Sequence, residues 1–138
     1  MYMKPICRLL SLIFLITGIC SAQIPDLLGN WTATGNGYIA EKGYTTLQEN
    51  SLNFSITEQN GRLFAGNVTY TENGTKAVEG FAGAIGLDNK TIFRVEFSEG
   101  YSLGTIISEN EIEMLYLEDG EMGRVFIDRL HRVTSSPA

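Results

Sequence analysis

The chain offers few side chains with the types and spacing that chemistry requires. Its single histidine, His131, has no nucleophile in a recognised arrangement with it, and no Gly-x-Ser-x-Gly motif occurs. Glu111 and Glu113 could form a carboxylate pair, but they share one face of an alternating segment, which favours a solvated surface. No His/Cys cluster or calcium loop is present, so we expect neither a metal nor a cofactor. The residues therefore argue against an enzyme, and His131 is predicted to lie on the surface.

Polar residues that alternate in step with apolar ones are better candidates for a site. Asp128 is in step with Phe126, and Glu79 is in step with Phe81, which predicts that both carboxylates point inwards. An inward polar side chain must find a hydrogen-bonding partner or a ligand. Tyrosine hydroxyls could line the same interior. The candidate ligand-binding residues are Asp128, Glu79, Tyr70, Tyr101 and Tyr116.

Turn signals recur along the chain and define the elements that must position these residues. Asn-Gly and Asp-Gly adopt the positive φ of tight hairpins, which join adjacent antiparallel strands. Intervals of roughly ten to fifteen residues leave no room for a crossover helix. The pattern predicts an all-β meander that closes as an eight-stranded antiparallel up-and-down barrel. The turn signals are Asn60-Gly61, Asn73-Gly74, Asp88-Asn89, Glu99-Gly100, Glu109-Asn110 and Asp119-Gly120.

Alternation within the predicted strands separates an apolar face from a polar one. In the fifth strand, Phe93, Val95 and Phe97 are expected to point inwards. Arg94 and Glu96 are then expected on the solvent side. The predicted strands are 28–34, 51–58, 62–71, 76–87, 91–98, 101–108, 111–117 and 123–133.

Glycines mark the remaining irregular positions. Residues 38–46, with glycines around them, are expected to form a long loop, which either covers one mouth of the barrel or is a disordered connection. A glycine in mid-strand weakens the strand unless the backbone must bend or approach another closely. Gly66, Gly83 and Gly104 are therefore interpreted as bends that close the barrel, and not as ligand contacts.

The first 22 residues have the order of a signal peptide. A basic start at Lys4 and Arg8 precedes an apolar run, and small residues precede a cut between Ala22 and Gln23. A lipid anchor at Cys20 and an uncleaved membrane tether stay open as alternatives. The residues before Cys20 suit lipid modification badly, and the apolar run is too short for a confident membrane span. The sequence therefore predicts a secreted or extracytoplasmic protein.

Cleavage would leave one domain, 23–138. Both cysteines, Cys7 and Cys20, lie in the removed segment, so the mature domain has no disulfide and no thiol nucleophile. It keeps 8 basic side chains against 16 acidic ones, a net charge of −8. No basic stripe is present, so nucleic acid is not expected as a partner, nor is a membrane surface once the signal peptide is removed.

Asn-x-Ser/Thr sequons occur at five asparagines of the predicted domain. In an exported chain such sequons could carry glycans. Asn73 and Asn89 lie in predicted turns and are the candidate glycosylation sites. The full set is Asn30, Asn53, Asn67, Asn73 and Asn89.

Three stretches of the chain resemble a known family. The Gly-x-Trp of Gly29 and Trp31 resembles the opening of calycin-type, lipocalin-like barrels, and especially of avidins. Residues 61–66 and 130–133 are also similar to avidins. In an up-and-down barrel the last strand lies beside the first. Arg132 can therefore stack on Trp31, and Gly29, Trp31 and Arg132 are predicted to close the barrel.

The same resemblance argues against biotin as the ligand. Avidins hold the ureido oxygen with polar residues two and six positions beyond the tryptophan, where this chain has Ala33 and Gly37. A tyrosine expected after Gly66 is replaced by Val68, and Trp31 is the sole tryptophan. The polar residue late in the last strand is kept, as Asp128.

Two functions remain after these considerations. The first is an exported barrel that binds a small, partly apolar molecule, with oligomerisation left open. The second is an extracellular protein-interaction or inhibitor module whose barrel is filled by side chains. An interior plugged by phenylalanines would favour the second, and the residues in question are Phe54, Phe81, Phe93 and Phe97.

Overall fold

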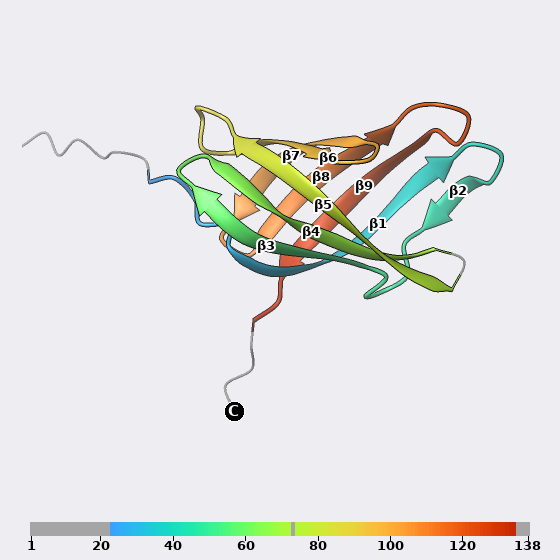
Figure 1. Cartoon of the computed structure of the whole chain (residues 1–138), viewed down its shortest axis with the longest axis horizontal. Coiled ribbons are helices and arrows are strands. Elements are labelled where there is room, and N and C mark those ends of the chain that lie inside the picture. The colour runs from blue at the N-terminus through green and yellow to red at the C-terminus, as the bar shows by residue number, and fades with distance from the viewer. Residues whose placement is uncertain (1–22, 73, 135–138) are drawn as a thin grey trace, which may run out of the picture.

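The computed structural model describes residues 23–72 and 74–134, which form an all-β barrel (Figure 1). β1 pairs antiparallel with both β2 and β3, each strand from β3 to β8 pairs antiparallel with the next, and β1 also pairs with β9. This pairing closes an eight-stranded barrel of β1 and β3 to β9, as the turn signals predict. The strands are β1 (Gly29–Ile39), β2 (Gly43–Thr46), β3 (Leu52–Asn60), β4 (Leu63–Glu72), β5 (Thr75–Ile85), β6 (Thr91–Glu96), β7 (Tyr101–Ser108), β8 (Glu111–Glu118) and β9 (Arg124–Arg132).

Two predictions fall wholly or partly beyond this part of the chain. The signal peptide at 1–22 and the sequon at Asn73 lie outside the described residues. Asn89 lies in the turn between β5 and β6 with a φ of 54° and is partly exposed. Within 23–72 and 74–134, no helix has the length and apolar character needed to cross a membrane.

The segment 38–46 is a β-hairpin, so the prediction of a long loop is wrong. β1 continues to Ile39 and turns through Glu41, at a φ of 65°, into the short β2. The rings of Tyr38 and Tyr44 meet edge to face across the hairpin, with centroids 5.5 Å apart. A left-handed glutamate at a turn carries no strong sequence signal, since asparagine and glycine are the usual residues there.

The glycines that suggested a loop instead make room inside the barrel. A Cβ on Gly35 would lie 2.5 Å from a carboxylate oxygen of Asp128, and one on Gly37 would lie 2.6 Å from the Phe126 ring. Both distances are too short for a real side chain. The bare backbone of β1 therefore accommodates the inward side chains of β9.

Trp31 and Arg132 close one end of the barrel, as predicted. They are partners across β1 and β9, and the Arg132 guanidinium lies 4.2 Å from the centre of the Trp31 ring. Trp31 is 1% exposed and donates through Nε1 to the carbonyl oxygen of Leu27 at 3.0 Å. Arg132 donates to the carbonyl oxygens of Asp26 (2.8 Å) and Glu109 (3.0 Å). It thereby joins the segment before β1 to the β7–β8 turn.

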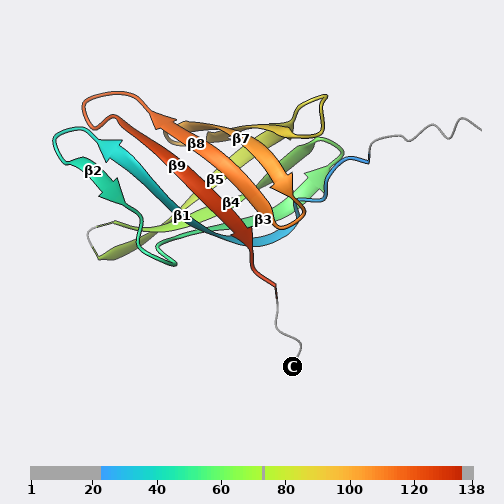
Figure 2. The same cartoon turned by 180° about the vertical axis from the view of Figure 1, so that it is seen from behind.

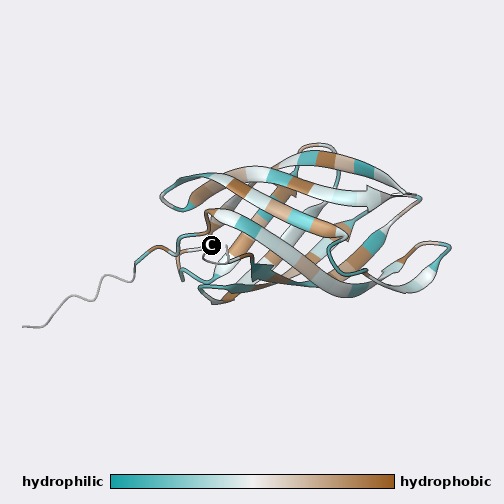
Figure 3. Cartoon of the chain, turned by 90° about the horizontal axis from the view of Figure 1, so that it is seen from below, coloured by the Kyte–Doolittle hydropathy of each residue, from teal (hydrophilic) through white to brown (hydrophobic). Residues whose placement is uncertain are grey.

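The core is packed against this closed end. Gly29 begins β1 with a φ of 121°, which favours glycine, and a Cβ there would lie 3.4 Å from Nη1 of Arg132. Figure 3 shows apolar and polar residues in alternation along the strands. The most deeply buried aliphatic side chains near the closed end are Leu27, Ile85, Ile92, Ile112 and Leu130.

Candidate functional site

A cavity of about 470 Å³ lies at the other end of the barrel. The ends of β1, β4, β6 and β8 and the starts of β3, β5, β7 and β9 lie at this end of the barrel (Figure 1). Phe54, Val68 and Phe126 supply apolar wall. None of Gly66, Gly83 and Gly104 lines it, which agrees with their interpretation as structural positions. The polar residues of its lining include Tyr70, Glu79, Arg94, Glu96, Tyr116 and Asp128.

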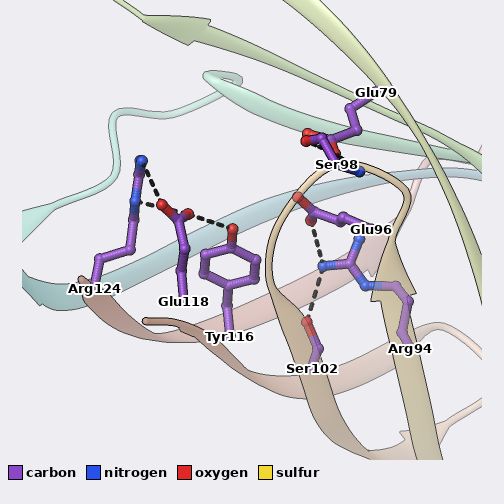
Figure 4. Close-up of polar contacts among 8 residues, drawn as sticks. All are labelled: Glu79, Arg94, Glu96, Ser98, Ser102, Tyr116, Glu118 and Arg124. Carbon is purple, nitrogen blue, oxygen red and sulfur yellow. Dashed lines mark hydrogen bonds and ion pairs between the residues drawn. The ribbon is translucent and has the colours of Figure 1, made fainter. Parts of the chain in front are cut away.

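Arg94 is the central polar residue of this cavity, and it is only 4% exposed. Its Nη2 donates to a carboxylate oxygen of Glu96 at 2.8 Å and to the hydroxyl of Ser102 at 2.9 Å (Figure 4). The guanidinium also lies 5.0 Å and 5.1 Å from the ring centres of Phe54 and Phe81. Its Nε and Nη1 are buried and have no hydrogen-bond acceptor. Arg94 is thus held in place through Nη2, while Nε and Nη1 remain as unused hydrogen-bond donors.

The inward position of Arg94 overturns the prediction for the fifth predicted strand, now β6. Phe93, Val95 and Phe97 are 51%, 54% and 69% exposed, so they lie on the outer surface. Ile92 decides the orientation, because it packs in the core at the closed end at 1% exposure. Strand alternation then places Arg94 on the same inward side. Two of the phenylalanines that could plug the barrel are therefore outside it.

Asp128 lies on the same cavity wall, from β9, and is 4% exposed. Its Oδ1 has no hydrogen-bond donor. Burial raises the pKa of the Asp128 carboxyl from 3.8 to about 7, while the charge of Arg94 lowers it and that of Glu96 raises it. Burial also raises the pKa of Glu96, which Arg94 opposes. Asp128 is therefore poised between its neutral and charged forms near neutral pH.

A second polar group lies closer to the mouth. The hydroxyl of Tyr116 donates to Glu118 at 2.7 Å, and Arg124 forms an ion pair with the same carboxylate at 3.0 Å (Figure 4). Burial, followed by the bond to Glu118, raises the pKa of Tyr116. Glu79 accepts a bond from the backbone N–H of Ser98 at 2.8 Å and another from its hydroxyl. These rim residues pair with one another, and Arg124 Nε, which forms no hydrogen bond, still has Glu118 as its ion-pair partner.

The structure brings four of the five predicted ligand-binding residues together. Asp128, Glu79, Tyr70 and Tyr116 all line the cavity. Tyr101 does not, and its predicted inward position is wrong. It is 48% exposed because the alternation of β7 turns its neighbour Ser102 inwards.

The residues considered for catalysis lie on the outer surface, as predicted. Glu111 and Glu113 form ion pairs with Arg129 at 2.7 Å and 2.5 Å, with all three side chains about a third or more exposed. His131 is exposed beside them on β9. Among the residues that the structure describes, no group of three or more His, Cys, Asp or Glu side chains could hold a metal ion.

Sequence reasoning missed Arg94, Glu96 and Ser102. The available signal was the spacing of Ile92, Arg94 and Glu96, which places all three on the same side of a strand. If Ile92 is buried, both charged residues then point inwards as well. The more apolar alternating set in that strand masked this signal.

Comparison with known proteins supports the fold. No known protein family matches the sequence, and no match was found among curated proteins. Among solved structures, that of EF1p2_mFAP2b bound to DFHBI is similar, with a TM-score of 0.57 and 12% sequence identity. The likeness covers 78% of this chain and 94% of that one. At this identity it shows the fold alone, a small β-barrel. The resemblance to calycin-type barrels, and especially to avidins, stays a prediction.

Proposed function

We propose that this protein is a binding barrel that holds one small, partly apolar molecule in the cavity at its open end. The supporting observation is the pair of buried, charged side chains there, Arg94 and Asp128, that keep hydrogen-bonding atoms without partners. Such atoms are costly in an empty interior and become favourable when a ligand pairs with them. The cavity volume of about 470 Å³ falls within the usual range for small-molecule sites.

The unpaired atoms indicate the chemistry of the ligand. Nε and Nη1 of Arg94 need an acceptor, and Glu96 already balances the charge of Arg94, so a neutral carbonyl is a better match than an anion. Asp128 accepts from an N–H or O–H when charged and can donate when neutral. Phe54 and Val68 would contact the apolar part. A neutral ligand with a carbonyl next to a donor, such as an amide or lactam, fits this set.

The similar solved barrel, EF1p2_mFAP2b, is bound to DFHBI in its structure, which supports a ligand-binding interior for this fold. The rival function, an interaction module with a filled barrel, expected four phenylalanines inside. Phe54 and Phe81 are buried there, but Phe93 and Phe97 are exposed, which leaves room for the cavity. We also infer that the protein is exported, cleaved before Gln23 and without catalytic activity. The basis for this inference is the order of the first 22 residues and the absence of histidine and cysteine from the cavity lining.

Native mass spectrometry of the protein purified from its own host tests the proposal. We expect a chain that begins at Gln23 and carries one non-covalent adduct. Asp128→Ala should remove most of the adduct while the protein stays folded, because it deletes a polar contact in the cavity. The matched control, His131→Ala, changes an exposed residue of the same strand and should keep the adduct. The proposal would be contradicted if the wild-type protein carried no adduct. It would also be contradicted if the Asp128→Ala protein carried the adduct at full occupancy.

We further predict that biotin binds negligibly. The positions where avidins place polar contacts hold Ala33, Gly37 and Val68, and Ala33 and Val68 are fully buried and apolar. Each lost partner for the ureido group costs about 1–3 kcal/mol. Titration calorimetry should therefore detect no heat at micromolar biotin. Retention on immobilised biotin, with release by free biotin, would show that Arg94 and Asp128 serve the ureido group in another way.

A further inference from the structure

The outer surface of β6 to β9 carries two parallel rows of apolar side chains. Strand register places the members of each row directly opposite one another, at spacings where neighbouring side chains touch. Figure 2 shows β7, β8 and β9 side by side on one side of the barrel. We call these eight residues the apolar face: Phe93, Leu103, Leu115 and Ile127 in one row, and Val95, Tyr101, Leu117 and Val125 in the other.

This apolar face is well exposed. Apart from the partly buried Leu117, its members are between 40% and 55% exposed. Taking about 180 Å² for each fully exposed side chain, the face presents roughly 600 Å² of surface. Monomeric soluble proteins rarely expose a patch above about 300–600 Å². An area of roughly 800 Å² per partner is typical of a stable interface.

One border of the face is polar, as at the rim of an interface. The next row towards the closed end is polar and consists of Thr91, Thr105, Glu113 and Arg129 in register. Glu113 and Arg129 form an ion pair there at 2.5 Å. An apolar, uncharged centre with a polar rim is the usual anatomy of a protein–protein contact.

The other side of the barrel has no such surface. The outward positions of β3 and β4 pair Asn53 with Thr69 and Ser55 with Asn67. Two of the sequons lie on this polar side. Exposed apolar residues elsewhere on the barrel, such as Leu63 and Val78, do not form the paired rows that make up the apolar face.

We propose that the apolar face binds the same face of a second copy of this chain, in a two-fold symmetric dimer. The chain has a net charge of −6, so two copies repel one another over most of their surface. The apolar face carries no charged side chain, so it cannot form ion pairs with a strongly acidic or basic partner. Its rim holds both signs, Glu113 and Arg129, so it is complementary to itself under a two-fold axis. Its area of roughly 600 Å² lies at the lower end of what one partner contributes to a stable interface.

Sedimentation equilibrium of the protein purified from its own host tests this proposal, over concentrations of roughly 1–100 µM. We expect a dimer. Leu115→Arg places a charge at the centre of the apolar face and should raise the dissociation constant roughly 30-fold or more. Leu103→Ser removes apolar area without adding charge and should weaken the dimer in the same direction. The matched control is Leu87→Arg, at an 88% exposed leucine outside the face, which should remain dimeric.

Several outcomes would overturn the proposal. They are a wild-type monomer at the highest concentration, a dimer that both variants retain, and a dimer that Leu87→Arg dissociates equally. A monomer that floats with phosphatidylcholine vesicles, and loses this ability in Leu103→Ser, would assign the face to a lipid surface instead. Thermal unfolding of each variant verifies that it is folded, since both substituted side chains point outwards.

Discussion

Replacing Trp31 with alanine is expected to lower the free energy of unfolding by about 3–5 kcal/mol, which is the usual cost of deleting a large buried aromatic. Trp31 is 1% exposed, and its ring supports the guanidinium of Arg132 at 4.2 Å. Without the ring, Arg132 loses a cation–π contact, and the segment before β1 loses the hydrogen bond from Nε1. The barrel would then be weakened where its first and last strands meet.

Urea denaturation followed by far-ultraviolet circular dichroism measures this effect. Tyr44→Ala provides the control, because Tyr44 is an aromatic residue that is 62% exposed. It loses only the edge-to-face contact with Tyr38 and should cost no more than about 1.5 kcal/mol. An equal loss in both variants would mean that Trp31 has no special part in closure. Ligand retention should be unaffected by Trp31→Ala at temperatures where the protein stays folded, since Trp31 does not line the cavity.

The meander could be predicted because hairpin turns are specified locally. Gly61, Gly74, Gly100 and Gly120 all adopt positive φ at the turns that the sequence indicated. The strands between them then follow in antiparallel order without any long-range information. The β1–β2 hairpin escaped prediction because its turn uses Glu41, which gives no such local signal.

The orientation of β6 could not be derived from the strand alone. Residues 92, 94 and 96 form one side of this strand, and Phe93 and Val95 form the other. Either side could face the interior of a sheet, and the more apolar side, with Phe93 and Val95, faces out. The choice depends on Ile92 joining the core at the closed end and on the outer residues continuing rows that begin on β7, β8 and β9. Both are contacts between distant parts of the chain. This non-local choice also determines the site, because it turns Arg94 into the cavity.

Asp128, in contrast, could be found from the sequence because it is a lone acid in step with apolar neighbours near the chain end.

Replacing Asp128 is also expected to have a large effect on the stability of the protein. Asp128→Asn should stabilise the ligand-free protein at pH 8 by up to about 4 kcal/mol, and should have little effect at pH 4. The carboxyl titrates at 3.8 in the reference state and at about 7 in the folded protein, because burial disfavours the charge. Each unit of difference corresponds to about 1.4 kcal/mol.

The direction follows from proton binding. Between pH 4 and pH 7 the folded protein holds a proton on Asp128 that the unfolded chain has released, so the stability of the wild type falls as pH rises through this range. Above pH 7 both states are ionised and the loss is complete. Asparagine has no charge to bury, so the difference between variant and wild type should grow from pH 4 and level off near pH 8.

Urea denaturation of both proteins from pH 4 to pH 8 measures this difference. Asp88 provides a control of opposite sign, because bonds from the hydroxyl and amide of Thr91 lower its pKa to about 2. Asp88→Asn should therefore destabilise the protein at neutral pH, and the loss should shrink as pH falls towards 2. A difference for Asp128→Asn that is independent of pH would mean that the carboxyl is solvated in the cavity. A gain at pH 8 that accompanies loss of the bound adduct would mean that Asp128 is kept for the ligand at the expense of stability.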